Sequence, residues 1–112
     1  MNVKAFLFLA VILCFTACTD DTEYTYYYEV TGTAGRYGVT YQDEYDQVEL
    51  GGIVGNGWTY TWNQTGKRFM YVIAQSEEKE GSVTVRIYKN GKVIAKNTKS
   101  GEFAIASITG NY

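Results

Sequence analysis

The stretch SVTVRIYKNGKVIAK, residues 82–96, decides the fold class. Val83, Val85 and Ile87 alternate with polar residues, which is the period of a half-buried strand. The dipeptide Asn90-Gly91 is a hairpin signal, because both residues tolerate the positive φ angles of a tight turn. The stretch therefore predicts two antiparallel strands joined by a hairpin.

The register of this hairpin can be argued from the residues that it brings together. A two-residue loop at Asn90-Gly91 would place Lys96 opposite Val85, among core residues. A three-residue loop, with Gly91 in the left-handed conformation of a bulge, moves Lys96 to the outer face opposite Thr84. We therefore predict the three-residue loop, with the pairs Ile87–Val93 and Val85–Ala95.

The rest of the chain alternates strand-like runs with turn signals. A near-continuous apolar run at 68–75 predicts a strand buried on both faces, while the glycine-rich segment 51–57 and the segment 97–101 predict a loop and a turn. No segment has an apolar pattern of helical period and length. Further strands are predicted at 26–31, 37–41, 45–50, 58–62 and 103–108. Seven to eight short antiparallel strands indicate an all-β fold, an immunoglobulin-like β-sandwich over residues 26–112.

Composition excludes several classes of function. The chain has 112 residues, enough for one domain, and its 10 Lys and Arg against 12 Asp and Glu give a formal net charge of -2. A nucleic-acid-binding protein of this size would carry a basic patch, so we predict no nucleic-acid partner. The chain has no histidine, which excludes histidine-based catalysis and histidine metal sites.

The N-terminus predicts export and a lipid anchor. Lys4 precedes an apolar run at 5–15, which is shorter than the ~20 residues of a membrane-spanning helix. Small residues then precede Cys18, as in the cleavage site of bacterial lipoproteins. We predict a lipoprotein signal peptide at 1–17, acylation of Cys18 and an acidic tether at 18–25. The alternatives are an ordinary secretory signal cut elsewhere and an uncleaved anchor.

Two groups of side chains are candidates for a site. Trp58, Tyr60 and Trp62 share one face of a strand, where they would stack on sugars if exposed or pack in the core if buried. Calcium takes six to eight oxygens, but the four carboxylates at 43–49 lack the spacing and the glycine of an EF-hand, so a solvated loop and edge strand is the simpler interpretation. We predict no metal, no cofactor and no catalytic residues. The lysines of the late hairpin indicate an exposed edge strand, protected against aggregation; they are Lys92, Lys96 and Lys99.

Several motifs are similar to those of the MmpS family, small accessory proteins of mycobacterial lipid transporters. They are YEVTG at 28–32, VTY at 39–41, GSVTVRIY at 81–88, NGKVI at 90–94 and SGEFA at 100–104. The resemblance implies an extracytoplasmic β-sandwich that assists an efflux-type transporter and carries no catalytic residues. Family members use a membrane-spanning anchor and often a cysteine pair, at positions that Val85 and Ile108 occupy here.

These observations lead to an expectation about function. We expect a non-enzymatic binding or accessory module of the cell envelope, held by the lipid on Cys18 in the cell membrane or outer membrane. It would face the periplasm or the cell surface, and its partner would be an envelope protein or a transporter. The alternative is a surface binder of glycans or host polymers through exposed Trp58, Tyr60 and Trp62.

Overall fold

Eight antiparallel strands form two four-stranded sheets that pack face to face as a β-sandwich. The computed structural model describes residues 22–112, so the predicted signal peptide and Cys18 lie outside the described residues. Within this described part, no helix has the length and apolar character needed to cross a membrane. The strands are β1 (Glu23–Gly32), β2 (Arg36–Gln42), β3 (Val48–Gly55), β4 (Trp58–Thr65), β5 (Phe69–Ser76), β6 (Ser82–Lys89), β7 (Lys92–Ser100) and β8 (Ile105–Asn111).

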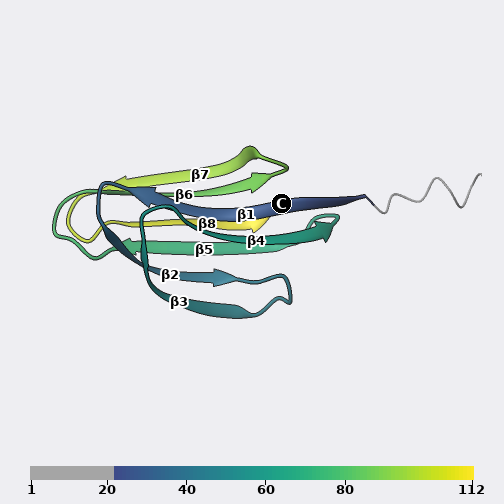
Figure 1. Cartoon of the computed structure of the whole chain (residues 1–112), viewed down its shortest axis with the longest axis horizontal. Helices are drawn as coiled ribbons and strands as arrows, with labels where there is room; N and C mark the ends of the chain where they lie inside the picture. Colours follow the sequence, from purple (N-terminus) through teal and green to yellow (C-terminus); the bar gives the residue numbers. More distant parts are fainter. Residues whose placement is uncertain (1–21) are drawn as a thin grey trace, which may run out of the picture.

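Sheet A has the strand order β4-β1-β6-β7, and sheet B has the order β3-β2-β5-β8. The predicted all-β sandwich is confirmed, and so is the edge position of the lysine-bearing strand β7. The strands run alongside one another, and the C-terminus lies at the same end as the start of β1 (Figure 1). We call this end the tether end, because the predicted tether leads into it.

Period-two alternation places the core between the sheets. On β1, Tyr26, Tyr28 and Val30 point inward, whereas Tyr27 and Glu29 point outward. The other strands follow the same rule, so each sheet contributes one apolar face to a single core. The remaining buried apolar residues are Ala34, Tyr37, Val39, Trp62, Met70, Val72, Ala74, Val83, Val85, Ile87, Ala104, Ala106 and Ile108.

The predicted three-residue hairpin loop was wrong. Asn90 and Gly91 form a two-residue loop with φ angles of 50° and 80°, closed by the pair Lys89–Lys92. A bulge then leaves Ile94 unpaired, so the observed pairs are Ile87–Ala95 and Val85–Asn97. The tight loop matches the twist of the strands, and the bulge returns Ala95 to the inner face. Lys96 is outside as expected, but opposite Arg86.

Two predicted breaks lie inside strands. The glycine-rich segment belongs to β3, which starts at Val48 and pairs with β2; a bulge at Gly51 shifts the register. Backbone pairing with β2 compensates for the low strand propensity of glycine. The segment 97–101 continues β7 to Ser100, so the turn comes later and β8 begins at Ile105.

Candidate functional site

Trp58, Tyr60 and Trp62 face the interior of the sandwich. Trp62 is only 6% exposed, and its indole N–H donates to Gln64 Oε1 at 2.7 Å. Its ring lies 4.6 Å from that of Tyr28. Trp58 and Tyr60 are partly buried against the same core. This strand therefore offers core packing, not an exposed platform on which a sugar could stack.

The carboxylates at 43–49 close a loop between β2 and β3. Asp43 is buried, and its Oδ1 accepts hydrogen bonds from the backbone N–H groups of Tyr45 at 2.8 Å and Gln47 at 3.0 Å. Arg68 donates to the Asp43 carbonyl and forms an ion pair with Asp46 at 2.9 Å. The interpretation as a fully solvated loop is therefore wrong for Asp43, whose oxygens are used by the loop itself.

The carboxyl groups of Asp43 and Glu49 have pKa values that are shifted in opposite directions. Burial alone would raise the pKa of Asp43, but hydrogen bonds from the backbone of Gln47 and Tyr45, together with a hydrogen bond from Glu49 and the charge of Arg68, lower it. The hydrogen bond that Glu49 shares with Asp43 raises the pKa of Glu49. Over residues 22–112, no group of three or more Asp, Glu, His or Cys side chains is arranged to hold a metal ion.

The buried tyrosines predict an alkaline limit to stability. Burial raises the pKa of Tyr28 to about 12, against 10.0 for a free phenol. Because the folded state favours the neutral phenol, the contribution of Tyr28 is complete below pH 10.0 and is lost as the pH rises through about 12. We expect the free energy of unfolding, measured by urea titration, to fall over this window. Tyr28→Phe should weaken the dependence on pH, and an unchanged slope would contradict this assignment; Tyr45→Phe, at an exposed loop position, is the control.

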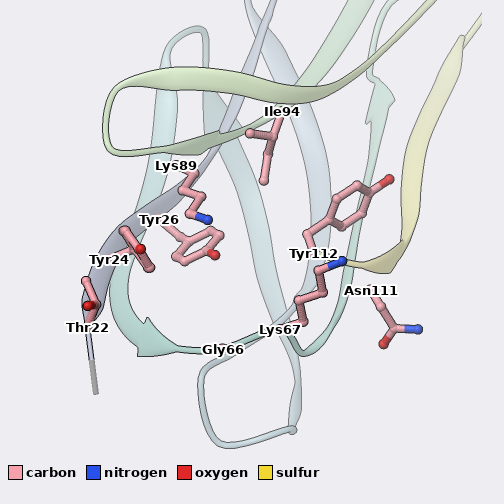
Figure 2. Close-up of a pocket in the computed structure, with 9 residues that line it drawn as sticks. All are labelled: Thr22, Tyr24, Tyr26, Gly66, Lys67, Lys89, Ile94, Asn111 and Tyr112. Atoms are coloured by element: carbon pink, nitrogen blue, oxygen red, sulfur yellow. The ribbon is translucent and has the colours of Figure 1, made fainter. Parts of the chain in front are cut away.

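A pocket opens between the two sheets at the tether end. Its volume is about 420 Å³, and Figure 2 shows the side chains that surround it. Both sheets contribute to it, together with the loop between β4 and β5. We call it the tether pocket; its lining residues are Thr22, Tyr24, Tyr26, Gly66, Lys67, Lys89, Ile94, Asn111 and Tyr112.

The outer face of sheet B exposes several large apolar side chains among glycine and uncharged polar residues. Side chains that are directly opposite in an antiparallel sheet point to the same side, so the outward rows are Ile53–Gly38–Gln75–Ile105 and Leu50–Thr40–Ile73–Ser107. Leu50 is 82% exposed, Ile53 53% and Ile105 48%. These rows contain no charged residue, although the Glu77 carboxylate lies beside Gly38 at their margin. We call the surface formed by Val48, Leu50, Ile53, Ile73 and Ile105 the apolar face.

A shallow groove crosses the apolar face. Its volume is about 340 Å³, and it is lined by Gly38, Val39, Thr40, Leu50, Gly52, Ile73, Gln75 and Ile105. Gly38 leaves space in the floor of the groove because it has no side chain. The sequence carried a signal for this surface: the apolar run at 68–75 continues on both faces of β5. The prediction that both faces are buried was wrong, since Phe69 on the outer face is 44% exposed.

Comparison of the chain with known protein families and curated proteins found no match. The resemblance to the MmpS family therefore stays a prediction.

Proposed function

We propose that the chain is a lipid-anchored protein of the cell envelope whose β-sandwich binds a partner protein through the apolar face. The observation that carries the proposal is the groove in the outer face of sheet B that Leu50, Ile73 and Ile105 line together, with exposed apolar side chains and no charged residue in its lining. Soluble monomers rarely expose large contiguous apolar patches unless they bind something. Burial of one such side chain contributes ~1.5–3 kcal/mol.

The anchor is supported by the N-terminal sequence. Small residues precede Cys18, and β1 begins at Glu23, so a short tether would join the lipid to the first strand. Two or three acyl chains on one cysteine hold a protein firmly in a bilayer, whereas one chain binds reversibly. The proposed location is the cell membrane or the outer membrane, with the domain facing the periplasm or the cell surface.

We propose a binding role without catalysis, cofactor or nucleic acid. Support comes from the absence of histidine and from the nearly balanced charge of the sequence. The motifs similar to the MmpS family support an accessory role beside a transporter or an export system. Eight antiparallel strands in two sheets support the finer assignment to the immunoglobulin-like class. The alternative of glycan binding loses support, because Trp62 packs in the core.

The proposal is tested by photo-crosslinking in intact cells of the organism that produces the chain. A photoreactive residue at Ile105, on the apolar face, should give one discrete adduct, whereas the same probe at Thr61, on the outer face of sheet A, should not. Leu50→Lys places a charge on the interface and should reduce the adduct about tenfold. Cys18→Ala should lose labelling by a palmitate analogue and also lose the adduct.

Each part of this proposal can fail separately. An adduct that survives Leu50→Lys, or equal adducts from both probe positions, would contradict the apolar face as the binding surface. Palmitate label on Cys18→Ala would contradict the anchor. An adduct of twice the chain's mass would identify the partner as a second copy of this chain.

A further inference from the structure

The tether pocket contains a hydroxyl group that makes no hydrogen bond within the described part of the chain. Tyr26 is 2% exposed and lines the pocket, and its hydroxyl has no hydrogen-bond partner among residues 22–112. Every fully enclosed side-chain N or O atom in that same range has a partner. The Tyr26 hydroxyl is therefore accessible from the pocket, and Lys89 lines the same pocket from the paired position on β6.

Positive charge converges on the same space. The Lys89 ammonium lies 4.2 Å from the centroid of the Tyr24 ring and 6.0 Å from that of Tyr26. Lys67 reaches the pocket from the loop between β4 and β5, on the opposite side from Lys89 (Figure 2). The ion pairs of the described chain are Arg68–Asp46 and Arg86–Glu29, so neither lysine is paired with a carboxylate there. No Asp or Glu lines the pocket.

The remaining lining combines apolar and aromatic side chains with the polar Thr22 and Asn111. Ile94 lies over the space between the two lysines, and the rings of Tyr24 and Tyr26 form one wall (Figure 2). The volume of about 420 Å³ is in the range of small-molecule sites. The pocket therefore suits a ligand with a compact anionic group and a carbon chain attached to it.

We propose that the tether pocket binds a phosphate ester. Lys67 and Lys89 would contact the phosphate oxygens as point charges, and the Tyr26 hydroxyl would donate a hydrogen bond to them. Ile94 and the Tyr24 ring would pack against the carbon part of the ester.

The position of the pocket suggests two sources for this ligand. Thr22 lines the pocket and lies four positions after Cys18, so a fully extended tether would hold the pocket within about 14 Å of the anchor. A phospholipid headgroup is then within reach; this source alone rests on the proposed anchor. The other source is a soluble phosphate ester.

The test uses residues 22–112 without the anchor, because this segment contains all eight strands and the whole core. Backbone amide shifts are followed by NMR during titration with glycerol 1-phosphate and with dihexanoyl phosphatidylglycerol below its micelle concentration. Octyl glucoside serves as an uncharged amphiphile. We expect saturable shifts at Tyr26, Lys67, Lys89 and Ile94 with both phosphate ligands and none with the glucoside.

The variants separate the pocket from general attraction to anions. Tyr26→Phe removes only a hydroxyl and should weaken binding about tenfold, since a hydrogen bond to a charged group is lost. Lys67→Gln, at an exposed loop position that cannot disturb the core, should weaken it similarly. Lys99→Gln, at the far end of β7, is the matched control and should leave affinity unchanged.

The outcomes either support or overturn the proposal. Tighter binding of the lipid than of glycerol 1-phosphate supports the site and identifies a headgroup as the ligand, while equal affinity supports the site with a soluble ester. Absence of saturable shifts in the pocket, equal shifts with the glucoside, or equal weakening by Lys99→Gln overturns it. Because the segment lacks Cys18, failure here is distinct from failure of the proposed anchor.

Discussion

Gly32→Ala is expected to lower the free energy of unfolding by about 3 kcal/mol or more, which is a large part of the stability of a small domain. Gly32 ends β1, where the chain leaves sheet A for sheet B. A Cβ atom at this position would overlap the backbone carbonyl of Ser82 and come within 2.5 Å of the Tyr37 hydroxyl.

Each of these two neighbours is held by a hydrogen bond that a displacement would break. The Ser82 carbonyl accepts a hydrogen bond from the Thr33 N–H at 3.2 Å, and the Tyr37 hydroxyl donates to the Ala34 carbonyl at 2.8 Å. Tyr37 is itself fully buried. Relief of the overlap must therefore disturb the pairing of β1 with β6 or the turn that follows β1.

Urea denaturation of residues 22–112, followed by tryptophan fluorescence, measures the effect. Gly55→Ala is the matched control, because a Cβ atom at Gly55 would meet nothing within 4 Å. We expect the control to stay within about 0.5 kcal/mol of the parent protein. Equal midpoints for Gly32→Ala and Gly55→Ala would show that the β1–β6 junction is looser than the structure indicates.

The sequence predicted the strands with alternating large side chains better than it predicted the glycine-rich strand β3. Alternation on β1, β4 and β6 reports burial directly, because one face of each strand packs on the opposite sheet. Strand β3 lies at an edge, and its glycines carry no side-chain signal. Its existence depends on backbone hydrogen bonds to β2, which local sequence does not encode.

The candidate sites were harder to predict than the fold. The pattern of Trp58, Tyr60 and Trp62 reports that three rings share a face, but the same pattern fits an inner or an outer face. The tether pocket joins Tyr26, Lys67 and Lys89 from β1, the loop after β4, and β6. Pairing of β1 with β6 places Tyr26 opposite Lys89, and the loop that leads from sheet A to sheet B brings Lys67 to the same pocket, so no local motif could have shown the three together.

Trp62→Ala should cost about 3–5 kcal/mol of unfolding free energy, because it removes a large buried ring. The ring stacks on Tyr26 at 5.8 Å and lies 5.9 Å from Tyr60. Its loss opens a cavity between sheet A and the core. Gln64, which is nearly buried, also loses the indole donor of its Oε1 atom, while its amide still donates to the Gly66 carbonyl.

Two further variants separate these contributions. Trp62→Phe keeps an aromatic ring but leaves the Gln64 oxygen without its donor, so it should cost about 1–3 kcal/mol. Phe69→Ala removes a ring from the exposed outer face and should cost less than either Trp62 variant. Circular dichroism during urea titration measures all three, because it does not depend on the tryptophan signal. If Trp62→Ala is instead as stable as Phe69→Ala, the Trp62 ring does not pack in the core. An exposed ring on this strand could then stack on a glycan.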